Sequence, residues 1–129
     1  MVNFFLKIVI CLFAFHLSCS QDSIVVKSVV DTTSIKVGEQ FSYNIIIESN
    51  SFQEINFPDN FNFSPFTIAD QFPVDTNYLN SKKIISKKFN LTHFDEGSYL
   101  INPLELSIGK KIYFTEKIDI DVITIKVDT

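Results

Sequence analysis

The sequence lacks arginine and tryptophan, and its 129 residues include only two cysteines, three glycines and one methionine. A nucleic-acid binder needs positive charge against phosphate, but 11 lysines against 15 acidic residues give a net charge of −4. Two cysteines are too few for a disulfide-dense scaffold. Because 46% of the residues are apolar, the chain can form a core, and the composition disfavours disorder.

Residues 1–20 have the layout of a secretory signal peptide. Lys7 is the only charge, an unbroken apolar run covers residues 8–15, and small residues follow at 18–20. Cleavage after residue 20 would leave a single domain, residues 21–129, that contains no cysteine. That domain could hold neither a disulfide nor zinc bound through sulfur.

Two alternatives to a cleaved signal stay open. Residues 4–19 could be a membrane anchor, although 16 residues interrupted by Lys7 and His16 are short for a hydrocarbon layer of about 30 Å. Acylation of Cys19, as in a lipoprotein, is the other alternative.

The composition of residues 21–129 predicts an all-β fold. Ile and Val total 24 in this part of the chain, whereas Leu, Ala and Met total 6, and β-branched side chains suit a pleated sheet better than a helix. The clearest strand is 41–48, in which every second residue from Phe41 to Ile47 is apolar. About seven short strands without a helical period predict an immunoglobulin-like β-sandwich. Further strands are expected at 24–30, 84–93, 99–101, 104–108, 112–114 and 117–127.

The expected strand at 84–93 carries a conflict. If Ile85, Phe89 and Leu91 face the core, Lys87 points inward as well. We interpret this strand as bulged or as a sheet edge, because edges carry lysine to block pairing with other chains. The last strand is expected to bury Ile118, Ile120 and Val122, and its apolar alternation then shifts by one residue, which suggests another bulge or a change of neighbour.

Two features are candidate interaction surfaces. Between residues 54 and 78 aromatic rings alternate with Pro, Asn and Asp, and such a loop either forms an exposed contact surface or caps the core, the latter being favoured. Two lysine pairs could meet an acidic partner or lipid headgroups, but protection of a sheet edge explains them as well. The candidate residues are Phe57, Phe61, Phe63, Phe66, Phe72, Lys82, Lys83, Lys87 and Lys88.

The spacing Asp95-x-Gly97-x-Tyr99 resembles a tyrosine corner. In that motif a phenol donates to the backbone of the turn before a late strand of the sandwich. The alternative is that Tyr99 is an ordinary half-buried strand residue.

Catalytic and metal-binding patterns are not recognised in the sequence. His93 is the only histidine of residues 21–129, and a pair with Asp95 or Glu96 would still need a nucleophile or more ligands. Asp119 and Asp121 share one strand face, but calcium takes six to eight oxygens. We therefore expect a protein that is not an enzyme and that uses no metal or small-molecule cofactor.

The C-terminal half resembles a known family. Residues 90–104 (NLTHFDEGSYLINPL) are similar to the recurring stretch LT-x-FD-x-G-x-Y-x-I-x-P, and residues 108–115 (IGKKIYFT) to its continuation G-K-x-Y-x-T. Residues 30–40 (VDTTSIKVGEQ) resemble the opening V-D-x-x-x-I-x-x-G-E-x. Together these motifs resemble the exported immunoglobulin-like domain of BatD-type proteins of Bacteroidetes.

This resemblance implies a non-enzymatic envelope protein that serves as an interaction or scaffold module. Its expected partners are other envelope or membrane proteins, among them von Willebrand A-type Bat proteins, with no nucleic acid. The expected location is the periplasm or the extracytoplasmic side of a membrane, with secretion as the alternative. Family members usually continue into a transmembrane helix, so a chain that stops at Thr129 is expected to be either a fragment or a stand-alone secreted domain.

A carbohydrate-binding or surface adhesion module is the alternative function, because β-sandwiches often host sugars. It would need a platform of exposed aromatic rings, and the absence of tryptophan disfavours it.

Overall fold

The computed structural model describes residues 23–50 and 54–125, and these residues confirm the predicted all-β fold. The expected signal peptide and the expected end of the last strand lie outside the described residues. The described residues include no helix that is long and apolar enough to cross a membrane. The strands are β1 (Ile24–Val30), β2 (Ser34–Lys36), β3 (Gln40–Ser49), β4 (Ile55–Asn56), β5 (Thr67–Gln71), β6 (Asp75–Leu79), β7 (Lys82–Thr92), β8 (Gly97–Ile101), β9 (Glu105–Ile108), β10 (Lys111–Phe114) and β11 (Ile118–Ile123).

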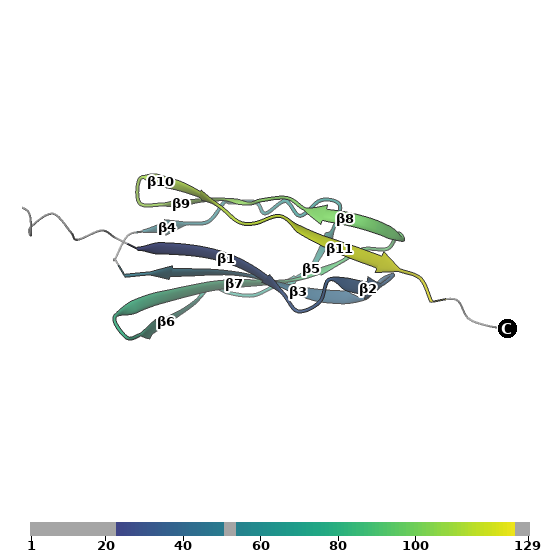
Figure 1. Ribbon diagram of the computed structural model, residues 1–129, viewed down its shortest axis with the longest axis horizontal. Coiled ribbons are helices and arrows are strands. Elements are labelled where there is room, and N and C mark those ends of the chain that lie inside the picture. The colour runs from purple at the N-terminus through teal and green to yellow at the C-terminus, as the bar shows by residue number, and fades with distance from the viewer. Residues whose placement is uncertain (1–22, 51–53, 126–129) are drawn as a thin grey trace, which may run out of the picture.

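These strands form two layers (Figure 1). One layer is the sheet β1-β3-β7-β5, with β6 also paired to β7. The other layer holds the two sheets β10-β9-β4 and β2-β11-β8, in which β2 pairs parallel to β11. When β1 is taken with β2, β5 with β6, β8 with β9, and β10 with β11, the segments make seven strands of an immunoglobulin-like sandwich, as the sequence predicts.

One long hairpin joins the two small sheets into a single layer. The antiparallel register is the same from Gly97↔Val122 to Ile108↔Lys111, although Pro103 interrupts the first arm. Proline has no N–H to donate, so the ladder cannot continue through it. Between the two halves the Thr115 N–H donates to the Leu104 carbonyl at 3.0 Å. The Leu104 N–H donates to Thr115 Oγ1 at 2.8 Å, so a side chain takes the place of a backbone acceptor.

The Thr115 hydroxyl also links the two layers. Tyr43 on β3 is fully buried, and its phenol donates to Thr115 Oγ1 at 3.4 Å. Burial raises the pKa of the Tyr43 phenol, while hydrogen bonds to the side chains of Thr115 and Ser28 act in the opposite direction. Thr115 is itself 97% buried. A buried polar contact thus joins β3 to the middle of the hairpin.

The core follows the alternation seen in the sequence. On β3 the residues from Phe41 to Ile47 alternate between buried and half-buried, and the buried set faces the second layer. The second layer contributes its own buried alternation. Its buried residues include Ile101, Leu104, Leu106, Ile108, Ile120 and Val122. The expected burial of the last strand is confirmed, because Ile120 and Val122 are buried and Ile118 packs against the core.

The interpretation of residues 84–93 as a sheet edge is wrong, and the bulge in this part of the sheet lies in the neighbouring strand β5, between Ile68 and Asp70, rather than in β7. β7 pairs with β3 along an unbroken register and with β5 and β6 on its other side, so it is a central strand. The neighbour changes from β6 to β5 opposite Lys87 and Lys88. At this gap the Lys87 ammonium lies over the buried Phe89 ring, 5.3 Å from its centroid, and donates to the Phe72 carbonyl. The Phe72 N–H donates to the Lys88 carbonyl at 3.0 Å. The inward lysine thus marks the change of neighbour.

The Thr115 contact can be tested by removing its hydroxyl. Thr115→Val preserves the side-chain shape but removes the acceptor of the Leu104 N–H and one of the two side-chain partners of the Tyr43 phenol, Ser28 being the other. An unsatisfied buried donor costs about 1–3 kcal/mol, so we expect the free energy of unfolding in urea to fall by about 1–3 kcal/mol.

Thr76→Val on β6 is the matched control, because Thr76 is exposed. Its free energy of unfolding should change by less than about 0.5 kcal/mol. An equally small loss for Thr115→Val would show that its hydroxyl does not bridge the layers.

Candidate functional site

The phenylalanine-rich segment mainly fills the core. Phe63 and Phe66 are 2% and 6% exposed. The Phe63 ring packs edge-on against Tyr43 at 5.1 Å and Phe89 at 4.8 Å between ring centroids, and Phe66 packs against Phe41 at 5.4 Å. The interpretation of Phe63 and Phe66 as contact residues is therefore corrected. The other interpretation, that the rings cap the core, fits their positions.

The remaining rings of this segment are less deeply placed. Phe57 and Phe61 are half-buried and pack against the core, where Phe61 lies 4.6 Å from the Phe89 ring centroid. Phe72 is exposed, and the Lys88 ammonium lies over its ring at 5.2 Å. Of the five candidate rings, Phe72 thus presents the most surface, and a lysine of its own chain already contacts it.

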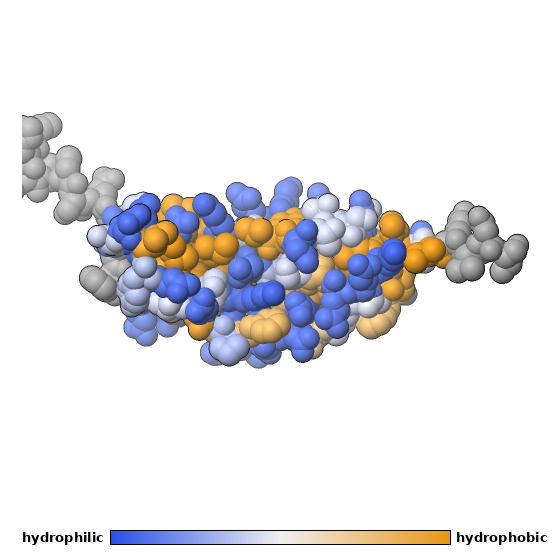
Figure 2. All heavy atoms as spheres, turned by 90° about the horizontal axis from the view of Figure 1, so that it is seen from below, coloured by the Kyte–Doolittle hydropathy of each residue, from blue (hydrophilic) through white to orange (hydrophobic). Residues whose placement is uncertain are grey.

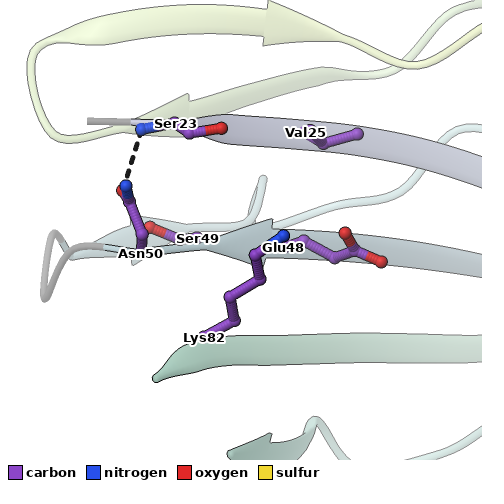
Figure 3. A pocket seen from close by; sticks show the side chains of 6 residues that line it. All are labelled: Ser23, Val25, Glu48, Ser49, Asn50 and Lys82. Carbon is purple, nitrogen blue, oxygen red and sulfur yellow. Dashed lines mark hydrogen bonds between the residues drawn. The ribbon is translucent and has the colours of Figure 1, made fainter. Parts of the chain in front are cut away.

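The lysines of the two pairs differ in exposure, with Lys82 and Lys88 exposed and Lys83 and Lys87 half-buried. Lys82 rises from β7 beside Glu48 and helps to line a small hollow between β1, β3 and β7 (Figure 3). The Ser23 N–H donates to Asn50 Oδ1 at 2.8 Å at the rim of this hollow. Its volume of about 10 Å³ admits no more than about one water. Lys83 is half-buried, so the four lysines do not form one open basic surface.

The Asp95–Tyr99 turn is held by a phenol. Tyr99 Oη donates to the Glu96 carbonyl at 3.1 Å, and Asp95 is exposed. Gly97 has a φ of 150°, and a Cβ added there would lie 3.1 Å from Tyr99 Oη and 3.2–3.3 Å from the ring. Glycine is required here by both the backbone conformation and the nearby ring.

The candidate residues for catalysis or metal binding do not form a common site. His93 is half-buried, and its ring packs edge-on against Tyr99 at 4.2 Å and Phe66 at 5.7 Å between centroids. Asp119 and Asp121 are exposed, and Asp121 accepts a hydrogen bond from the Ser98 hydroxyl at 2.7 Å. Within residues 23–50 and 54–125 no group of three or more His, Cys, Asp or Glu could hold a metal ion.

Exposed apolar side chains gather at the end of the sandwich where β11 stops. We call this set the end patch, and its members are Val37 (38% exposed), Phe94 (63%), Ile123 (47%) and Ile125 (62%). The Val37 N–H donates to the Ile123 carbonyl at 2.9 Å, which joins two of its members. A Cβ on Gly38 would lie 3.7 Å from the Phe94 ring, so Phe94 covers the same turn. Figure 2 shows apolar surface at this end, on the right of the view.

Exposed acidic residues lie close in sequence to the members of the end patch. Glu39 follows the Val37–Gly38 turn, Asp95 and Glu96 follow Phe94, and Asp121 precedes Ile123 by two residues. All four are exposed, whereas Lys36 is the basic residue of the same turn. Among the described residues, the end patch is therefore an apolar surface whose charged neighbours in the sequence are mostly acidic.

The sequence does not predict the end patch, although the pattern of the last strand contains a signal for it. The apolar alternation of the last strand shifts by one residue after Val122, which suggests a bulge or a change of neighbour. In the structure Val122 is buried and pairs with Ile35, whereas Ile123 is exposed and pairs with Lys36 at the end of β11. Consecutive apolar residues on a half-buried strand necessarily place one of them in solvent.

A second hollow bears on the carbohydrate alternative. Its volume is about 290 Å³, and no aromatic ring is among the residues that line it. Amide and carboxylate groups could bind sugar hydroxyls, but the hollow lacks the aromatic platform that this alternative requires. Its lining consists of Pro58, Asn60, Asn62, Ser64, Asn102, Pro103, Leu104 and Glu105.

Comparison with known protein families gives a match over most of the chain. The family described as BatD DUF11 like domain matches residues 28–122, which is more than half of the chain. Comparison with curated proteins gives no match, and comparison with solved structures also gives none.

The Asp95–Tyr99 turn yields a stability prediction. Gly97→Ala places a methyl group against the Tyr99 phenol in an unfavourable backbone conformation, and we expect the free energy of unfolding to fall by about 1–3 kcal/mol. The same substitution in a Tyr99→Phe background should cost less, because the hydroxyl is the nearest contact. Equal costs in both backgrounds, measured by urea unfolding, would argue against the phenol contact.

Proposed function

The chain belongs to the BatD family, and we propose on this premise that it is a non-enzymatic extracytoplasmic protein whose β-sandwich binds other envelope proteins. The family suggests an envelope protein. Export by the predicted signal peptide and a periplasmic or membrane-associated position are parts of the proposal. The observation that carries the binding role is the end patch.

The end patch supports binding because its apolar side chains are exposed to solvent over a large part of their surface. Phe94 and Ile125 are each more than 60% exposed. Contiguous exposed apolar surface with a polar rim is typical of protein interaction sites. An aromatic ring flanked by branched aliphatic residues also suits the centre of an interface, which excludes water around a few large side chains.

The charges around the end patch define the chemistry of the partner. Among the described residues, four acidic side chains outnumber Lys36 near the end patch, so a matching surface has an apolar centre and a basic rim. The acidic residues are Glu39, Asp95, Glu96 and Asp121. Exposed rim charges mainly accelerate association, and salt screens them over about 10 Å. We propose von Willebrand A-type Bat proteins of the envelope as the partners that bear such a surface.

A scaffold role also agrees with the environment of His93. Its ring is packed between two aromatic side chains, and the neighbouring Tyr99 phenol donates to a backbone carbonyl. His93 therefore contributes to packing beside the Asp95–Tyr99 turn, which in turn supports Phe94. In this proposal the imidazole stabilises the end of the sandwich and performs no chemistry.

The proposal predicts a binding defect from changes in the end patch. A Phe94→Ser, Ile123→Ser double variant removes two exposed apolar side chains and should weaken binding to a purified von Willebrand A-type protein of the same organism by about tenfold or more. Calorimetric titration measures this change, and circular dichroism checks that the variant remains folded. Higher salt should slow the association of the wild-type protein.

Phe72→Ser is the matched control, because Phe72 is also exposed but lies on the connection between β5 and β6. It should leave the affinity unchanged. If Phe72→Ser abolishes binding while the double variant binds normally, the interface lies on the phenylalanine-rich segment. Absence of binding by the wild-type protein would contradict the proposed partner.

A further inference from the structure

We propose that two copies of this chain associate through the open edge of β10, paired antiparallel about Tyr113. This association does not depend on the end patch, because β10 belongs to the half of the hairpin that pairs with β9 rather than with β8. The partner is identified by self-complementarity in backbone, side chains and charge. Each of these is visible in the structure.

The backbone of β10 is available on one side. In the described part of the chain β10 pairs with β9 and is the outermost strand of the sheet β10-β9-β4. The Thr115 N–H points to β9, because it donates to the Leu104 carbonyl at 3.0 Å. Backbone groups alternate in direction along an antiparallel strand, so Tyr113 also faces β9, whereas the N–H and C=O groups of Ile112 and Phe114 face the open edge.

The side chains of these two residues are unusual for an edge. Ile112 and Phe114 are 59% and 62% exposed. Proteins commonly protect an edge strand with a central lysine, a proline or a bulge. The edge strand β1 follows that rule, because its central residue Lys27 pairs with Glu48 at 3.9 Å. The centre of β10 instead presents two large apolar residues beside backbone groups that have no partner among the described residues.

Antiparallel pairing about Tyr113 gives partners both to the outward backbone groups and to the exposed apolar side chains of β10. It places Ile112 of one copy opposite Phe114 of the other, and the reverse pair follows by symmetry. Both residues direct their N–H and C=O groups outward, so each pair can exchange two hydrogen bonds. An aromatic residue opposite a β-branched residue is also a favourable cross-strand pair.

The charges that flank β10 favour this pairing register over registers shifted along the strand. At the start of β10, Lys110 and Lys111 lie before Ile112. At its end, Glu105 lies opposite Phe114 within the sheet and Glu116 follows β10. Lys117 is the basic residue at that end. The antiparallel arrangement therefore brings the basic end of one β10 to the acidic end of the other. In residues 23–50 and 54–125 the one ion pair is Lys27–Glu48, so these flanking charges have no ion-pair partner among the described residues.

Charge reversal tests this association in the purified full chain. Sedimentation equilibrium of the wild-type protein should show a reversible monomer–dimer equilibrium. Lys110→Glu and Glu116→Lys, each alone, should raise the dimer dissociation constant by about threefold to tenfold, because each variant places like charges together. An equimolar mixture of the two should dimerise about as well as the wild type, since each hybrid pair again combines opposite charges.

Further variants separate this interface from general charge effects. Lys36→Glu changes the net charge as Lys110→Glu does but lies at the end patch, and it should leave the dissociation constant unchanged. Phe114→Lys should reduce dimerisation more than either charge reversal. A wild-type protein that stays monomeric at its highest soluble concentration would overturn the proposal. A dimer indifferent to Phe114→Lys and to both charge reversals would overturn it equally.

Discussion

The hydrogen bonds around the Thr115 hydroxyl hold the second layer of the sandwich together. Pro103 breaks the backbone ladder of the hairpin, yet the two arms keep one register because Leu104 donates to Thr115 Oγ1 across the break. The Tyr43 phenol donates to the same oxygen from the other layer. One half of the hairpin carries the open edge of β10, and the other half ends in the end patch. Both proposed surfaces therefore depend on this buried junction for their positions.

The two surfaces suggest how such a domain can serve as a scaffold. The end patch combines apolar side chains with mostly acidic neighbours in the described sequence, which suits a basic partner and excludes an acidic one. The edge of β10 is self-complementary, so it suits a second copy of the same chain. Because the surfaces lie on different halves of the hairpin, one copy could bind a partner while paired with another. Dimerisation would then present two end patches to the envelope and increase avidity.

Much of the fold could be predicted from sequence because alternation reports burial directly. The pattern from Phe41 to Ile47 identified β3 and its buried face, and Ile120 and Val122 were placed correctly on β11. β6 was not predicted, because all five of its residues are exposed and give no alternation. The edge assignment for β7 failed because Lys87 marks a change of neighbouring strand, which depends on residues distant in sequence.

The candidate site was less accessible to sequence reasoning. The aromatic rings of a phenylalanine-rich loop can cap the core or face a partner, and the composition of the loop does not distinguish the two. Within one segment Phe63 is buried and Phe72 is exposed. The end patch assembles Val37, Phe94 and Ile123 from three separate parts of the chain. Such a surface becomes visible only when the pairing of β2 with β11 is known.

Hydrogen exchange at the Leu104 amide tests the central claim most directly. This amide follows a proline in an interrupted part of the hairpin, where an unbonded N–H would exchange rapidly. If it donates to the buried Thr115 hydroxyl, its protection should match that of the Leu106 amide in β9 and should disappear only on global unfolding. Rapid exchange at Leu104, like that of the exposed Asn60 amide, would contradict the account.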